Sequence, residues 1–292
     1  MRQFVYTAEL PGLKKLVQIK ELSFDRFKHL IKLLTNDNNE TITSFLNDML
    51  SDLCIDVDDI YSCSFLDKLI LILTIRSICI APTLELTVTC PKTDKTFNSV
   101  IHISDIIQQL QELNLPDDIY CTTKEYNNGN LIINLGMPNT LCVDEKNISS
   151  LTTVIRKIIL NGEDVTNIKE DITDKLPLSI MKDIKEYIIY FYKHLHNVNL
   201  ISIPSPYDPV DTSINIPLNL FTNSVIEFIK ICFKRNLLSI YELEYCLLNR
   251  LKLDYELVRN STPAELNVYI NLLRAEEKER EAAEKKNNLN LP

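Results

Sequence analysis

Residues 66–106 constrain the fold more than any other part of the chain, because the spacing of their apolar side chains changes from a helical period to a strand period. An apolar run over residues 66–75 ends at a single Arg76. Two runs of alternating apolar and polar residues follow, separated by turn-forming residues at positions 90–95. This order of periods predicts a helix that leads into an antiparallel hairpin over Thr83–Ile103.

The rest of the chain carries both periods as well, with the helical one more frequent. We therefore expect an α+β fold, with a mainly helical body around a small antiparallel sheet, and a C-terminal helical module. The shorter elements that we predict are a hairpin or extended arm over 5–20 and strands over 120–123 and 130–135. The predicted helices span 24–34, 40–53, 147–160, 178–195, 221–234, 239–251 and 262–286.

Several helix ends are predicted from capping residues. Ser23 precedes the helix over 24–34, and Ser104 is placed to cap a short helix that runs to Leu113. Ser239 with Glu242, and Thr262 with Glu265, have the spacing of a capping box. The pair Asn161-Gly162 is expected to close the helix over 147–160 as a left-handed C-cap.

A proline-rich stretch suggests where the chain divides. Pro204, Pro206, Pro209 and Pro217 fall within residues 201–217, which we predict to be a linker. The predicted domains are then an α+β domain over 1–200 and a helical module over 218–286, followed by a disordered tail over 287–292.

Composition excludes several classes of function. The chain has 292 residues, 45% of them hydrophobic, so it can form a substantial core. Its net charge of −9 argues against a general nucleic-acid or anionic-membrane surface, and we expect neither as a partner. The 4 glycines lie far apart, which excludes a glycine-rich phosphate loop. The 8 cysteines are scattered, and with no export signal at Met1 we expect reduced thiols.

Candidate chemical sites are few. Cys90-Pro91 resembles half of a zinc knuckle, but no second cysteine follows within four residues. Pairing Cys90 with Cys121 would still leave fewer than the four ligands that a structural zinc site needs. No serine is flanked by the glycines of a nucleophile elbow. We therefore predict no catalytic residue, no metal and no cofactor.

Arg76 is the most informative single residue. It closes an apolar helix directly before a hairpin. One interpretation is that it holds the hairpin through hydrogen bonds to carbonyl groups, or to a carboxylate such as Asp67 or Glu85. The other is that its stem lies on apolar surface while its guanidinium reaches water. Both make Arg76 a structural residue.

The helix end Leu73-x-x-Arg76-Ser77, followed by a hairpin with Cys90 at its tip, resembles the baseplate hub assembly proteins of T4-like contractile-tailed phages. The resemblance spans residues 10–200 and implies a structural role for Arg76 and Cys90. The C-terminal part resembles a second hub assembly factor of these phages, through Tyr241, Tyr245 and the helix start Thr262-Pro263-Ala264-Glu265.

These resemblances imply a non-catalytic factor that assembles the tail baseplate hub. Its partners would be other tail or hub proteins, or further copies of itself, in the cytoplasm of the infected bacterial host or in the virion baseplate. A structural component retained in the virion, or an enzyme whose site is invisible in sequence, remain alternatives. The expected partner-binding residues are large apolar or tyrosine side chains: Tyr241, Tyr245, Leu248, Tyr269, Ile270 and Leu273. For the three tyrosines, packing in an ordinary core is the equal alternative.

Overall fold

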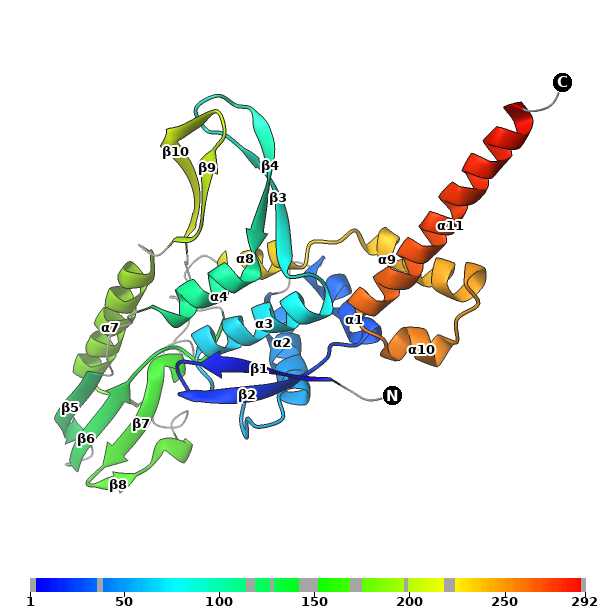
Figure 1. Ribbon diagram of the computed structural model, residues 1–292. Helices are drawn as coiled ribbons and strands as arrows, with labels where there is room; N and C mark the ends of the chain where they lie inside the picture. Colours follow the sequence, from blue (N-terminus) through cyan, green and yellow to red (C-terminus); the bar gives the residue numbers. More distant parts are fainter. Residues whose placement is uncertain are drawn as a thin grey trace.

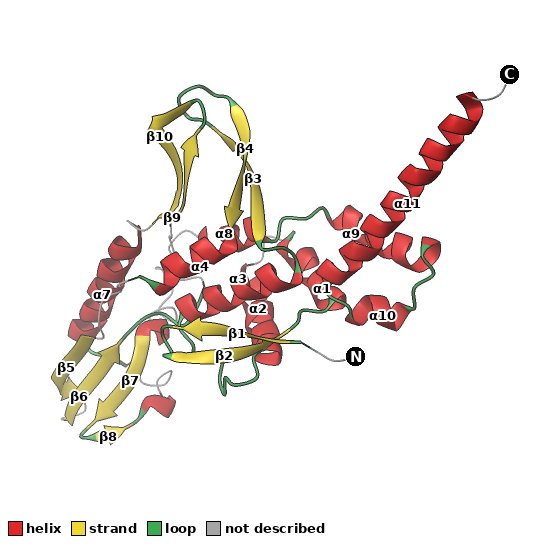
Figure 2. Cartoon of the chain, viewed as in Figure 1, coloured by secondary structure: helices red, strands yellow, loops and turns green. Residues whose placement is uncertain are grey.

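The computed structural model has the α+β architecture that the sequence predicts, with helices surrounded by small antiparallel sheets (Figure 2). It describes residues 4–35, 39–113, 119–126, 129–141, 152–168, 175–196, 199–217 and 224–289. Central helices carry two projecting hairpins on one side, a four-stranded sheet at one end and further helices at the other (Figure 1).

The N-terminal elements form as predicted. Strands β1 (Val5–Leu10) and β2 (Lys15–Lys20) pair as an antiparallel hairpin. Helices α1 (Phe24–Leu34) and α2 (Asn39–Leu53) follow, and the Ser23 hydroxyl accepts the Arg26 N–H as the N-cap of α1. Helix α3 (Phe65–Cys79) is buried on nearly every side, which makes it the central element of the core.

The hairpin of residues 83–103 is confirmed, with β3 (Thr83–Thr89) paired to β4 (Thr96–His102). The expected Ser104 cap is wrong, because helix α4 (Ile103–Gln111) begins before Ser104. Its N-cap is His102, whose side chain makes no capping hydrogen bond. The Ile103 N–H donates to the Pro82 carbonyl at 3.0 Å instead. The chain therefore passes from strand to helix without a loop, and the buried Ile103 side chain joins the core.

The four-stranded sheet contains the largest error of the sequence analysis. It consists of β5 (Ile119–Tyr126), β6 (Gly129–Leu135), β7 (Ile155–Leu160) and β8 (Glu163–Asp164). We predict a helix over 147–160, but residues 152–154 form a 3₁₀ turn and β7 is a strand; residues 147–151 lie outside the described part.

The turn after β7 shows why the helix prediction fails. Asn161 and Gly162 have φ of 53° and 89°, and Leu160 pairs with Glu163 across them. Two consecutive residues with positive φ form a hairpin turn rather than a helix cap. The β-branched residues before this turn then pair with β6, where Ile132 lies opposite Ile159.

Helix α7 (Leu178–His196) covers this sheet and connects it to the core. The rings of Phe191 and Phe65 meet edge-to-face at 6.2 Å, which joins α7 to the first turn of α3.

Where we predict a proline-rich linker over 201–217, the structure has a second hairpin, β9 (Asn199–Ser205) paired with β10 (Asp208–Pro217). Prolines are tolerated here because each strand of a two-stranded sheet has a free edge that needs no N–H donor. One face of β9 carries the buried residues Ile201, Ile203 and Ser205, and this alternation is the strand signal that the prolines obscure.

The C-terminal helices are α8 (Ser224–Cys232), α9 (Leu237–Tyr245), α10 (Tyr255–Asn260) and α11 (Pro263–Leu289), with a π-helical turn η3 (Cys246–Arg250) after α9. Asn236, not Ser239, caps α9 by accepting the Leu238 N–H. The prediction misses α10, which Asp254 caps.

The start of α11 is as predicted, but its end is not. Thr262 and Glu265 exchange both capping-box hydrogen bonds, at 2.7 and 3.2 Å. Residues 287–289 continue the helix, contrary to the expected disordered tail. Beyond Leu273 the described side chains of α11 are exposed, and ion pairs such as Arg280 with Glu276 stabilise this part of the helix.

The C-terminal helices pack directly on the N-terminal ones. The Phe24 N–H donates to the Ser261 carbonyl at 2.7 Å, and Lys28 of α1 pairs with Glu244 of α9 at 2.7 Å, both side chains being about four-fifths buried. The division into domains at 200 and 218 stays a prediction. Removing the C-terminal helices would expose Phe24 and Lys28, which these contacts cover.

Arg76 links three segments through its guanidinium group. The side chain is only 6% exposed. Its Nε donates to the Cys232 carbonyl at 2.9 Å, at the end of α8, and its Nη1 donates to the Ala81 carbonyl, two residues before β3. Burial lowers the pKa of the guanidinium from its usual value, and the nearby Arg235 lowers it further. The carbonyl partners agree with our first interpretation, while Asp67 and Glu85 take no part.

We expect Arg76→Met to destabilise the fold by about 1–3 kcal/mol, because one buried and one partly buried carbonyl group lose their charged donor. Chemical denaturation measures this loss. Arg235→Met is the matched control, since Arg235 is exposed and makes no hydrogen bond or ion pair within the described residues; it should stay within about 0.5 kcal/mol of the wild type. Equal stabilities of the two variants would show that the Arg76 hydrogen bonds contribute nothing.

A second cation holds the other end of α3. Lys68 is buried, and its Nζ donates to the Asn139 carbonyl at 2.6 Å and to the Tyr61 carbonyl at 3.3 Å. Burial lowers the pKa of this ammonium group to about 8. Next to it, Asp67 accepts the Gly12 N–H at 2.9 Å, and a side chain at position 12 would collide with that carboxylate. These contacts fix a loop and the first hairpin onto α3.

The lowered pKa of Lys68 predicts a specific pH dependence. The unfolded chain holds the Lys68 proton up to about its ordinary pKa of 10.5, whereas the folded chain loses it near 8. Because the unfolded state binds more protons in this window, stability increases as pH rises from 8 to 10.5.

Lys68→Met has no ammonium group to titrate at this position. Between pH 8 and pH 9.5, the free energy of unfolding of the wild type should therefore rise by about 1–2 kcal/mol relative to that of Lys68→Met. Urea denaturation of both proteins at the two pH values measures the difference. Parallel pH profiles would contradict the assignment of this titration to Lys68.

Candidate interaction surfaces

An apolar surface that we call the tyrosine face, formed by Leu238, Tyr241 and Tyr245, lies on α9. The three residues are three and four positions apart, which places them on one side of the helix. Their exposed fractions are 62%, 46% and 62%. The opposite side of α9 carries the buried Ile240, so the helix is fixed to the body while these large side chains meet solvent.

Contacts with α1 fix the position of this face. The Lys28 ammonium lies 5.7 Å from the centre of the Tyr241 ring and also pairs with Glu244. These contacts from one lysine hold Tyr241 at a defined position, so less conformational entropy is lost when a partner covers it. The surface is thus partly preorganised for binding.

The remaining predicted partner-binding residues do not join this face. Tyr269 is exposed on α11, beside the exposed Leu272. Ile270 is 9% exposed and belongs to the core, and Leu248 is half-buried against it. Leu273 is half-buried on α11, where it faces a groove shared with α9. The structure therefore separates the six residues into an exposed group, Tyr241, Tyr245 and Tyr269, and a buried or half-buried group, Ile270, Leu248 and Leu273.

Cys90 lies where the two projecting hairpins meet. It is buried at the tip of the β3–β4 hairpin, and its N–H donates to the Lys95 carbonyl at 2.9 Å. Hydrogen bonds from Ser205 and Thr93 lower the pKa of the thiol to about 7. Burial of the Cys90 side chain raises the pKa of the thiol, but by less than these two hydrogen bonds lower it. A structural role for Cys90 stays a prediction.

Tyr207 joins the hairpin tips, and the sequence analysis gives it no role. Its hydroxyl donates to the Thr96 carbonyl at 3.3 Å, its ring meets Phe97 edge-to-face at 6.1 Å, and the Lys95 ammonium lies 5.2 Å from its centre. We call the joined pair of hairpins the arch, formed by β3–β4 and β9–β10 (Figure 1). The available signal is Pro206-Tyr207, an aromatic residue in a turn between two alternating runs.

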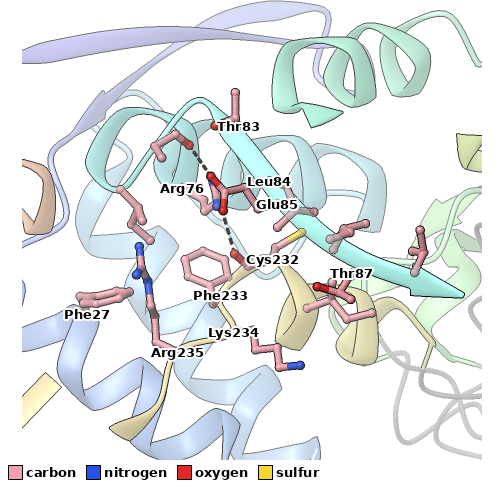
Figure 3. A pocket seen from close by; sticks show the side chains of 15 residues that line it. Phe27, Arg76, Thr83, Leu84, Glu85, Thr87, Cys232, Phe233, Lys234 and Arg235 are labelled. Carbon is pink, nitrogen blue, oxygen red and sulfur yellow. Dashed lines mark hydrogen bonds between the residues drawn. The ribbon is translucent and has the colours of Figure 1, made fainter. Parts of the chain in front are cut away.

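A groove of about 650 Å³ runs along β3 on its side away from β4. Residues 83–88 form one wall, and the end of α8 with residues 233–235 forms the other (Figure 3). Arg76, Lys234 and Arg235 contribute positive charge, and Glu85 is the acidic residue among the lining residues. A second groove of about 500 Å³, between α9 and α11, shares Phe27, Ile80 and Arg235 with it.

Two features of the described residues bear on metal binding and catalysis: the grouping of their metal-ligating side chains and the thiol in the groove. No three histidine, cysteine or acidic side chains come together as a metal site in the part that the structure describes. Cys232 lines the groove, but burial raises the pKa of its thiol to about 12, opposite to what a nucleophile needs. The described helices include none that is long and apolar enough to span a membrane.

Comparison with known proteins places the chain at the level of a family. No curated protein and no solved structure matches it. A family model described as "T4 bacteriophage base plate protein" matches residues 1–201. This match includes α3, the β3–β4 hairpin and the four-stranded sheet, and it covers more than half of the chain. The chain therefore belongs to the T4 bacteriophage base plate protein family.

Proposed function

We propose that this protein is a non-catalytic assembly factor of the phage tail baseplate hub, which holds hub subunits through protein–protein contacts. Membership of the baseplate family gives it a structural or assembly role in the baseplate, with other baseplate components as partners. The tyrosine face is the observation that carries the more specific role.

The energetics of association favour this surface. Tyrosine is among the residues that contribute most to protein interfaces, because its large ring buries apolar area at low entropic cost while its hydroxyl stays hydrogen-bonded. Tyr241 and Tyr245 are neighbours on one helix that is anchored from behind, and Leu238 extends the apolar area. A partner helix or loop laid across α9 would cover all three.

The place of action that we propose is the cytoplasm of the infected host, where tails assemble. A second candidate, a component retained in the virion baseplate, is favoured by α11, which extends far beyond the body (Figure 1). An exposed helix of this length suits a lasting connection to a neighbouring subunit. Mass spectrometry of purified virions separates the two: a transient factor is absent from the particle, and a component is present in stoichiometric amount.

The double variant Tyr241→Ser/Tyr245→Ser tests the tyrosine face. We expect binding of baseplate hub proteins from the same phage to weaken by about 30-fold or more, since truncating an interface hot spot costs about 2 kcal/mol. Pull-down with purified hub proteins measures binding, and complementation of a phage lacking the gene measures assembly.

Tyr190→Ser is the matched control, because Tyr190 is also an exposed tyrosine on a helix, α7, away from α9. All variants should melt within a few degrees of the wild type, as exposed substitutions change stability little. If the double variant binds and assembles like Tyr190→Ser, the tyrosine face is not the interface.

Removal of residues 218–292 tests the proposed domain division. We expect residues 1–217 to fold, because both hairpins, α3 and the four-stranded sheet remain, but to melt at a lower temperature, because Phe24 and Arg76 lose their C-terminal contacts. Capture of hub proteins should be lost. Circular dichroism and pull-down report the two effects, and an unfolded fragment would show that the chain is a single domain.

A further inference from the structure

We infer that the free edge of β3 is a docking site for an extended, acidic segment of a partner baseplate protein, which adds to the hairpin as a third strand. The inference deepens the proposed function and rests on it for the identity of the partner. It concerns a surface distinct from the tyrosine face, on an element within the family-matched part of the chain.

The strand register shows which backbone groups are free. The hydrogen bonds from Ile103 to Pro82 and from Cys90 to Lys95 lie at the two ends of the β3–β4 pair and belong to the same alternating set. In an antiparallel pair, every second residue bonds across and the residues between point their N–H and C=O groups outward. The outward residues of β3 are therefore Thr83, Glu85, Thr87 and Thr89, and the first three line the groove.

The outward groups of Thr83, Glu85 and Thr87 face the groove and have no partner within the described residues. None of the hydrogen bonds formed there uses the N–H or C=O of Glu85 or Thr87. Residues 83–88 line the groove along its whole length, which corresponds to roughly 20 Å of strand at 3.4 Å per residue. Unpaired edges of this kind are templates for an added strand.

The shape of the groove fits one extended segment. Neighbouring strands of a sheet are about 4.8 Å apart, so a strand added to β3 would lie in the opening of the groove. Leu86, Val88 and Ile231 line the groove and are only partly buried, so they supply apolar surface for side chains of the segment. Phe27 and Arg235 lie at one end of the groove and Thr87 at the other, so an added strand would pass between them (Figure 3).

The charges of the groove favour an acidic segment. Arg76, Lys234 and Arg235 line it, against Glu85 alone, in a chain whose net charge is −9. Arg235 makes no ion pair within the described residues, and Lys234 is exposed. If two copies of the chain paired through this same edge, each would bring an identical cationic edge against the other, and like charges placed together oppose pairing. A partner with carboxylates at alternate positions removes this repulsion.

Thr87 and Asn98 provide a matched pair of variants. They lie opposite each other, so both N–H groups point outward, one on the β3 edge and one on the β4 edge. Thr87→Pro removes the donor on the groove side, and Asn98→Pro removes the one on the other side. Each variant also loses the hydrogen bond from the Thr87 hydroxyl to the Asn98 side chain, at 2.9 Å, so their structural costs are alike.

The probes are overlapping synthetic peptides that cover the baseplate proteins of the same phage, each about 15 residues long so that it spans β3. Binding of labelled peptides to the full chain is measured by fluorescence anisotropy. We expect at least one acidic peptide to bind, about tenfold more weakly to Thr87→Pro and unchanged to Asn98→Pro. Methylation of alternate backbone nitrogens in that peptide should abolish binding in one register only.

A charge variant gives an independent readout if the proline variants fold poorly. Arg235→Glu should weaken binding by about tenfold, and Lys185→Glu, on the exposed surface of α7, should leave it unchanged. Equal effects of Thr87→Pro and Asn98→Pro, equal effects of the two charge variants, or no binding peptide would overturn the proposal. So would a dimer of the full chain that Thr87→Pro dissociates, since the occupant is then a second copy.

The outcome separates this inference from the proposed function. Tyr241→Ser/Tyr245→Ser should bind the peptide as the wild type does, because the tyrosine face lies outside the groove. Loss of assembly in that double variant, together with no specific loss in Thr87→Pro, would refute edge docking alone. Normal assembly in the double variant, with loss in Thr87→Pro, would refute the tyrosine face alone.

Discussion

The structure depends on one buried guanidinium. Arg76 closes the central helix, and its two hydrogen bonds reach the segment that begins the first projecting hairpin and the end of a helix 156 residues further along the chain. Because a charged donor removed from water must be hydrogen-bonded, its position and that of both carbonyls are fixed together. The base of β3 and the loop after α8 thereby keep a constant separation, and that separation is the width of the groove.

Local patterns predict the parts of the fold that local chemistry decides. The apolar run, the alternation after it and the capping pair Thr262–Glu265 each depend on residues close in sequence, and each is correct. The largest error comes from a turn whose meaning depends on distant residues. Asn161-Gly162 fits either a helix end or a hairpin, and the pairing of β7 with β6 decides between them.

The candidate sites follow the same rule. Exposed tyrosines can be proposed from sequence, but whether Ile270 or Tyr245 faces solvent depends on which side of each helix the body covers. The Arg76 contact with a carbonyl is predictable in kind, while its partner Cys232 is not, since nothing local relates the two positions. The groove along β3 forms where two segments distant in sequence pack together, so neither segment alone has a sequence pattern that predicts it.

The arch gives the molecule a mechanical property that neither of its hairpins has alone. A two-stranded ribbon free of other support is marginally stable and bends easily. Here two ribbons rise from different places on the body and meet at their tips through Tyr207, Thr96 and Phe97. Legs joined at the top form a braced frame, in which a sideways load on one becomes tension or compression in the other. A load on one hairpin is therefore shared by both, and the joined tips keep a fixed height above the body.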